Sequence, residues 1–306
     1  MSATRDPKQA DEADAYGLRA PPSDRSGMVG SLRVSLLSRQ GWPVLALLGI
    51  ALIGFLGPLL LTACGIDPNR ADVLAALQAP SLRHWFGTDD IGRDLFARVV
   101  AATRLDLTMA LSAVLLSALG GSIIGGVSAW MGGRLDRLLQ RVVDVAMAFP
   151  LFVVALTLAA VFGNGAGSVI LATALINLPF FARLARTEVA QRRALPYIDA
   201  ARLDGWSSSR ILVRILLPNS LPSLIAHATT NIGWAMLNGA SLSFVGMGVR
   251  PPAAEWGTLI ADGASAFVGG QWWLVVFPAL ALFGTVLIVN GAGQALRMRF
   301  VPGASQ

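Results

Sequence analysis

Residues able to carry out covalent chemistry are few in this chain of 306 residues, and their spacing matches no active site. A P-loop needs a lysine after a glycine-rich turn, yet Lys8 is the only lysine and stands in the sequence DPKQA. The single cysteine, Cys64, rules out an intrachain disulfide and a thiolate metal cluster. A membrane-embedded transferase would need clustered carboxylates and histidines, whereas Glu188, Asp199 and Asp204 are scattered. We therefore expect a chain that is not an enzyme, with no catalytic residue, metal site or cofactor of its own.

The composition is typical of a membrane protein. Charged residues make up 14% of the chain, against about 25% in an average soluble domain, and the mean hydropathy is +0.61. The formal net charge of +6 comes from arginines that stand in short gaps between long apolar runs. This pattern indicates membrane topology and contact with lipid rather than a surface for nucleic acid.

Uncharged runs define the membrane spans. A helix needs about 20 apolar residues to cross the hydrocarbon core of a bilayer. The run over residues 145–182 is too long for one helix, and the glycines within 163–167 divide it by a tight turn. The sequence therefore predicts an all-α integral membrane protein with six transmembrane helices: 43–62, 107–131, the two parts of 145–182, about 222–246 and about 274–294.

The distribution of Lys and Arg predicts the orientation of these spans. With the N-terminus in the cytoplasm, the cytoplasmic segments hold 18 basic residues and the opposite side holds 6, as the positive-inside rule requires. Both termini are then cytoplasmic. The predicted organisation is a disordered tail (1–27), an interfacial lead-in (28–42), a first transmembrane helix (43–62), an external loop (63–106), a five-helix core (107–298) that includes the longest cytoplasmic loop (183–220), and a short tail (299–306).

The predicted spans contain polar but no charged residues. Ion-coupled transporters place ionisable groups inside the membrane, so their absence from these spans argues against a stand-alone secondary transporter or channel. Energy for transport would then come from another protein. Asn231, Asn238 and Ser241 in the fifth span either line a pathway or form hydrogen bonds between helices.

The loop over residues 183–220 is predicted to contain a short helix. Pro196 suits a first helical turn, residues 197–204 favour a helix, and Gly205 provides a stop. On these features alone, the segment is an interfacial helix between two spans.

The same loop resembles the signature of ABC importer permeases, which reads E-A-A, three residues, G, nine residues, then I-x-L-P. All spacings match, and Asp199 stands where the signature has glutamate. In such permeases this short helix docks in a groove of the ATPase subunit, where small alanines permit close packing. The resemblance assigns the following residues to an ATPase-coupling helix and its flank: Tyr197, Asp199, Ala200, Ala201, Leu203, Gly205, Ile215, Leu217 and Pro218.

Three further segments, 83–107, 239–260 and 271–297, are similar to the dipeptide, oligopeptide and nickel branch of these permeases. The resemblance covers roughly residues 30–298. It implies the type I ABC importer permease fold and a multi-pass protein of the bacterial inner membrane that carries peptides or a related small solute. The implied partners are a second homologous permease, two ATP-binding subunits that hold ATP and magnesium, and an extracytoplasmic solute-binding protein.

Five residues of the predicted external segments have two interpretations. They either serve an external gate or contact the solute-binding protein, or they form an ion-paired turn and an aromatic membrane belt. These residues are Asp89, Arg93, Asp94, Glu255 and Trp256.

Overall fold

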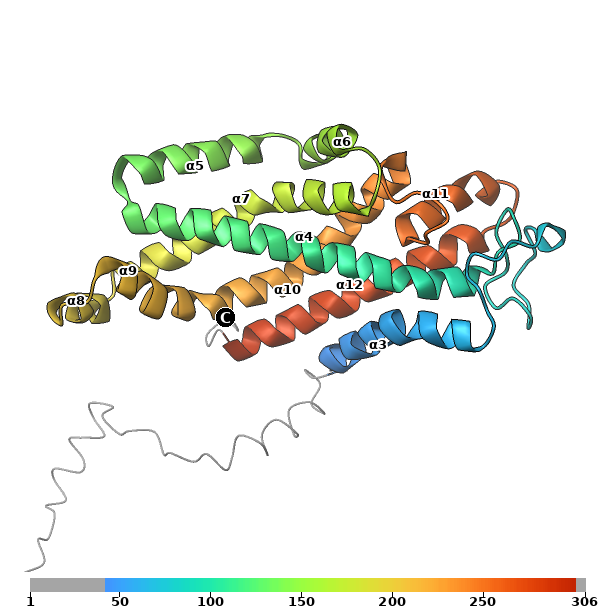
Figure 1. The fold of residues 1–306 in the computed structure, drawn as a ribbon, viewed down its shortest axis with the longest axis horizontal. Coiled ribbons are helices and arrows are strands. Elements are labelled where there is room, and N and C mark those ends of the chain that lie inside the picture. Colours follow the sequence, from blue (N-terminus) through green and yellow to red (C-terminus); the bar gives the residue numbers. More distant parts are fainter. Residues whose placement is uncertain (1–41, 301–306) are drawn as a thin grey trace, which may run out of the picture.

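The computed structural model describes residues 42–300, which form a long bundle of helices (Figure 1). The predicted tail (1–27), all but the last residue of the lead-in (28–42), and residues 301–306 lie outside the described part. The main helices are α3 (Trp42–Ala63), α4 (Leu95–Met131), α5 (Gly133–Ala148), α6 (Leu151–Phe162), α7 (Ala166–Arg193), α8 (Pro196–Leu203), α9 (Ser208–Ile211), α10 (Leu217–Leu242), α11 (Trp256–Phe267) and α12 (Trp273–Phe300). A 3-10 turn, η1 (Val73–Ala75), and two π-helical segments, η2 (Leu212–Leu216) and η3 (Ser243–Met247), complete the described elements.

The membrane architecture predicted from the sequence is confirmed as an all-helical fold with five or six candidate spans. Five helical runs are long and apolar enough to cross a bilayer: α3, α4, α7, α12 and the continuous run over 208–247. The sixth candidate consists of α5 and α6, which are bent by 93° relative to each other. Pro150 stands at this break and lacks the N–H that would continue the helix.

The second predicted span begins earlier than residue 107. Helix α4 starts at Leu95, because the Asp94 carboxylate caps it by accepting the backbone N–H of Ala97 at 2.9 Å. The predicted external loop (63–106) therefore contains the first turns of α4. Arg98 and Asp106 are buried on this helix, so the prediction of spans without charge does not describe it.

The turn predicted at 163–167 is present. Helix α6 ends at Phe162 and α7 begins at Ala166. Gly163 and Gly165 adopt φ values of +81° and +143°, which side chains with a Cβ atom rarely tolerate. Two helices can therefore reverse direction over very few residues.

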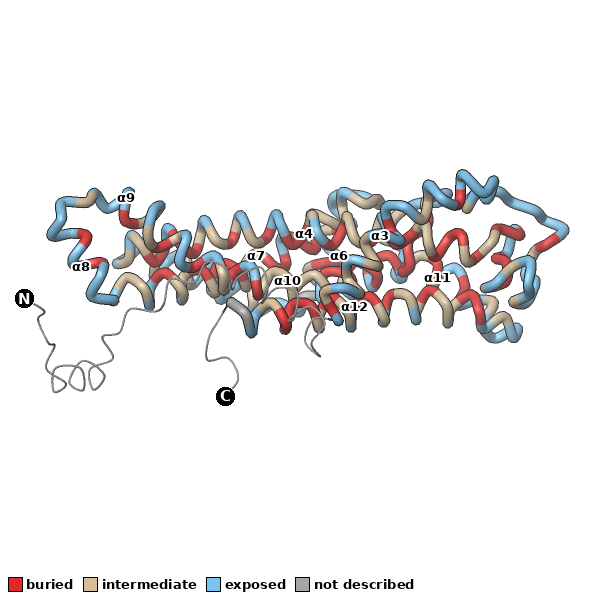
Figure 2. The backbone as a smooth tube through the Cα atoms, turned by 90° about the horizontal axis from the view of Figure 1, so that it is seen from below, coloured by how far each residue is buried: buried red, intermediate tan, exposed pale blue. Residues whose placement is uncertain are grey.

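Exposed positions run along the whole bundle (Figure 2), and many of them carry large apolar side chains. Helix α3 lies at its periphery and buries only Pro43, Gly54 and Leu61. Its remaining face presents large side chains such as Leu59, which is 63% exposed. A surface of this kind suits lipid rather than water.

The most extensive contact between helices joins α4 and α7. Gly121 and Gly125 of α4 meet the backbone of α7 directly. A Cβ atom on Gly125 would lie 1.9 Å from the carbonyl oxygen of Ala182, and one on Gly121 would lie 2.6 Å from that of Leu178. The two glycines therefore determine how closely these helices approach.

We predict that Gly125→Ala lowers the melting temperature and yield of the purified protein, because the added methyl group must force α4 and α7 apart. The control is Gly284→Ala in α12, where nothing lies within 4 Å of the new Cβ atom. The control should be neutral or stabilising by up to about 1 kcal/mol, since alanine favours helices over glycine. Thermal unfolding of both variants in detergent checks this, and equal melting temperatures would show that the contact tolerates a side chain.

Candidate functional site

The short helix α8 and its ending follow directly from the sequence. Pro196 occupies the first turn, as predicted, and Gly205 follows the helix with φ +76°. The backbone N–H of Trp206 donates to the carbonyl of Ala201 at 3.1 Å, and that of Gly205 donates to the carbonyl of Arg202 at 3.0 Å. This pair of bonds is a Schellman ending, which satisfies the last carbonyls of the helix and needs glycine at the left-handed position.

Helix α8 has one anchored face and one free face. Ile198 and Ala201 are buried against Val189, Ile211 and Leu216, so Ala201 packs within its own chain rather than at a docking surface. The opposite face lies at the far end of the bundle from α11 (Figures 1 and 2). The exposed residues of α8 include the predicted Tyr197, Asp199, Ala200 and Leu203, of which Leu203 is 89% exposed, together with Pro196 and Arg202.

The segments on either side of α8 are held firmly to the bundle. Arg193, at the end of α7, donates to the carbonyl oxygens of Ala129 and Trp130 at 3.0 and 2.9 Å, and its guanidinium lies over the Trp130 ring. A cation suits this position because unpaired carbonyls at the end of α4 carry partial negative charge. On the other side, Ile215 is half-buried in the π-helical segment η2, and Leu217 and Pro218 begin α10. The segments before and after α8 are therefore anchored to α4, α7 and the start of α10.

At the other end of the bundle, the segment over residues 88–94 is an ion-paired turn. Arg93 donates to the carboxylate of Asp89 at 2.6 Å, and Arg98 lies 3.7 Å from the same carboxylate. Asp94 caps α4 and also bonds His84 at 2.8 Å. Asp89 and Arg93 are buried, so in this conformation they brace the start of α4 and offer little surface to a partner.

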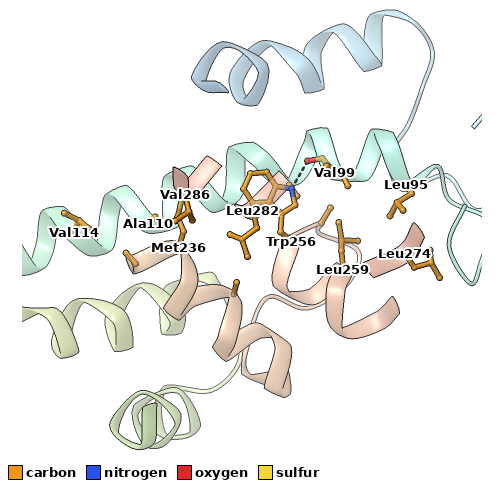
Figure 3. Packing of buried hydrophobic residues seen from close by; sticks show 14 of the residues in the cluster. Leu95, Val99, Ala110, Val114, Met236, Trp256, Leu259, Leu274, Leu282 and Val286 are labelled. Atoms are coloured by element: carbon orange, nitrogen blue, oxygen red, sulfur yellow. Dashed lines mark hydrogen bonds between the residues drawn. The ribbon is translucent and has the colours of Figure 1, made fainter. Parts of the chain in front are cut away.

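Glu255 and Trp256 are each only 1% exposed, so they too do not form a docking surface in this conformation. Glu255 caps α11 by accepting the backbone N–H groups of Gly257 and Thr258 at 2.9 and 2.8 Å. The indole N–H of Trp256 donates to the carbonyl oxygen of Val99 at 3.1 Å, which joins α11 to α4 within the apolar core (Figure 3). The interpretation of Trp256 as part of an aromatic membrane belt is therefore wrong.

The candidate pathway residues lie on α10. The side chains of Asn238 and Ser241 donate hydrogen bonds to carbonyl oxygens of their own helix, at 3.1 and 2.7 Å. These two bonds do not join α10 to another helix. Oδ1 of Asn231 is buried and has no hydrogen-bond partner among the described residues. Ser241 lines a hollow of about 350 Å³. Sequence reasoning missed the aromatic and aliphatic side chains that line this hollow with it, including Phe152, Leu237, Phe244 and Ile260.

Comparison with protein families gives one match over most of the chain. Residues 118–301 match the family described as binding-protein-dependent transport system inner membrane component. Among curated proteins, the chain is 38% identical to a probable D,D-dipeptide transport system permease protein of Escherichia coli K12, over 78% of this chain and 80% of the relative.

The match to two other relatives extends over a larger share of both chains. A dipeptide transport system permease protein of Alkalihalophilus pseudofirmus is 34% identical over 90% of this chain and 91% of the relative. The nickel transport system permease protein of Escherichia coli K12 is 38% identical over 85% of this chain and 94% of the relative.

The fold is also found among solved structures. A chain of the MetNI methionine ABC transporter, in an inward-facing conformation, superposes with a TM-score of 0.56 at 18% identity, over 67% of this chain and 96% of that chain.

We predict that Asp94→Ala destabilises the protein by about 1–2 kcal/mol, because α4 loses its N-cap and His84 loses its partner. Asp90→Ala is the matched control. The Asp90 side chain is exposed, and its ion pair with Arg93, at 3.9 Å, is long and therefore weak. Thermal unfolding of the two variants should separate them. An Asp94→Ala protein as stable as the Asp90→Ala control would mean that the cap contributes little.

Proposed function

From the premise that this chain belongs to the family of binding-protein-dependent transport system inner membrane components, we propose that it carries peptides or a related small solute and that separate ATPase subunits drive it by docking on α8. The chain is a multi-pass permease of an ABC importer, and importers of this class work with ATPase and other subunits. The observation that carries the docking assignment is the free apolar tip of α8, above all Leu203.

The geometry of α8 suits the transmission of force. Its inner face is buried against the end of α7 and against α9 and η2, while its outer face is available to a partner. A partner that moves on ATP binding would therefore displace α7 together with α4, to which Arg193 binds, and would act on α10 through η2. Alternating access then follows as a shift between two packings of the spans. The chain itself carries out no covalent step in this scheme.

The transport pathway is proposed to run along α10, at the contact with a second, homologous permease. The hollow beside Leu237, Ser241 and Phe244 is open and mainly apolar, with few polar groups that could orient a solute. Trp234 is exposed on the same helix. The dipeptide relatives favour a dipeptide as the solute, and the apolar hollow would contact its side chains rather than its charged ends. An extracytoplasmic binding protein would deliver the solute at the α11 end of the bundle.

We predict that Leu203→Glu abolishes co-purification of the ATPase subunits with this permease from its host membranes. Burying a charge in an apolar groove costs several kcal/mol, and loss of a hot-spot contact lowers affinity by at least about tenfold. Leu82→Glu is the matched control, because Leu82 is 98% exposed. It belongs to the segment between α3 and α4, which lies at the opposite end of the bundle from α8 (Figure 1).

Both variants should insert and elute in detergent as the parent does, and only Leu203→Glu should lose ATP-driven uptake. Normal recovery of ATPase subunits with Leu203→Glu would remove α8 as their docking site. A parent chain that purifies alone yet moves solute in liposomes would instead support a stand-alone transporter.

The proposed orientation places the α8 end in the cytoplasm and Cys64 on the external side, directly after α3. Cys64 is exposed and is the only cysteine, so it serves as a native probe. We predict that a membrane-impermeant maleimide labels it in intact spheroplasts. A Leu203→Cys variant in a Cys64→Ser background should react only after the membrane is permeabilised. The reverse pattern would mean that the orientation is inverted.

A further inference from the structure

Two carboxyl groups meet inside the bundle, where α4, α7, α10 and α11 come together. Asp106 of α4 is 6% exposed and Glu255, at the start of α11, is 1% exposed. Both residues line the same small cavity, and Asp106 accepts the backbone N–H of Trp256, the residue next to Glu255. The pair belongs neither to α8 nor to the hollow along α10, and the proposed transport cycle gives it no role.

Both carboxyl groups of this pair accept hydrogen bonds from the start of α11. Both oxygens of Glu255 accept from the first turn of α11: Gly257 N–H at 2.9 Å, and the N–H and hydroxyl of Thr258 at 2.8 and 2.9 Å. Oδ2 of Asp106 accepts the N–H of Trp256 at 3.1 Å. These donors hold the two carboxyl groups in place. Two ionised carboxylates have no hydrogen to share, however, so a bond between them requires a proton.

No positive charge compensates the pair among the described residues that line the adjoining cavity. The residues from α7 and α10 there are neutral, and those from α4, apart from Asp106, are apolar. Arg98, on α4, forms an ion pair with Asp89, and the guanidinium of Arg104 lies over the Phe55 ring. The next ionisable residue of α11 is Asp262, which is acidic. Two carboxylates buried together without a cation would be costly, and like pairs elsewhere hold one proton between them.

The adjoining cavity has a volume of about 10 Å³, which is close to the space needed by one water molecule. Thr173 of α7 lines it, is 2% exposed, and has a hydroxyl oxygen without a hydrogen-bond partner among the described residues. A buried hydroxyl is rarely left unpaired. A metal ion fits less well, because amides already occupy both oxygens of Glu255 and the described residues contain no group of three potential metal ligands.

We propose that Asp106 and Glu255 together hold one proton at the cavity that both residues line, and that one water molecule in this cavity joins Asp106 to Thr173. The chain takes up this proton from solvent when it folds and returns it when it unfolds. The junction of α4 and α11 is thus a proton-binding site. This inference does not rest on the proposed substrate or on ATPase docking.

The first test is the infrared spectrum of the purified full-length chain in detergent. A shared proton gives the carbonyl stretch of a protonated carboxylic acid at neutral pH. Asp106→Asn should remove this band, because the remaining Glu255 then ionises against an amide donor. Asp90→Asn, at an exposed carboxylate, should leave the band unchanged. A parent spectrum without the band overturns the proposal, and this reading does not depend on whether any variant folds.

The second test is thermal unfolding as the pH rises from about 6 to about 9. The folded pair holds a proton that the unfolded chain releases, so the melting temperature should fall as the pH rises. Asp106→Asn should flatten this slope relative to the parent and to Asp90→Asn. A parallel slope for Asp106→Asn would overturn the proposal. So would a melting temperature that rises on replacing choline with sodium at fixed pH, since that would show a bound cation.

The third test concerns the water. Thr173→Val keeps the shape of the side chain but removes the hydroxyl, so loss of a bridging water should lower the melting temperature by about 3 °C. Thr157→Val is the matched control, since the exposed hydroxyl of Thr157 donates only to the carbonyl of Val153 in its own helix. A stabilised Thr173→Val protein would show that the hydroxyl has no partner and that the cavity is dry.

Discussion

Inside a bilayer, two helices gain no hydrophobic free energy by leaving lipid for each other, so α4 and α7 must be held by contact at short range. Gly121 and Gly125 make that contact possible by letting backbone meet backbone. The position of every other functional element follows from it. Arg193 can reach the last carbonyls of α4 only because α7 runs close beside that helix, and the α8 segment is fixed in turn by Arg193 and by the cluster around Ile198.

The two ends of the bundle are stabilised by different means. At the α8 end, apolar packing and a glycine-terminated helix hold a small protrusion whose outer face stays free. At the α11 end, charged and polar groups pair within the protein: Asp89 with Arg93, Asp94 with His84, and Glu255 with the first turn of α11. Pairs of this kind are strong only in one geometry. The α8 end is thus suited to binding another protein, and the α11 end to a choice between discrete arrangements.

The sequence predicts an element correctly where the residues that determine it lie close together in the chain. Apolar runs located five spans, and Pro196 and Gly205 located α8, because hydropathy and turn chemistry act locally. The predicted third span is not a single helix, because the chain breaks at Pro150 between α5 and α6. The early start of α4 was missed, since Arg98 and Asp106 look like loop residues until their partners are known. One partner, Trp256, lies 150 positions away from Asp106. Because of this separation, the sequence does not show that Glu255 and Trp256 are buried against α4.

The length of α4 has a mechanical consequence. A helix of 37 residues rises about 1.5 Å per residue and is therefore about 55 Å long, more than the roughly 40–45 Å of a bilayer with its headgroups. If α4 tilts as a rigid rod, the glycine contact with α7 is the point where it is held most closely. A tilt of about 5° over such a length moves one tip by roughly 5 Å relative to the other. A movement of α4 by less than one helical turn at the α8 end would thus be enough to make or break single hydrogen bonds at its other end.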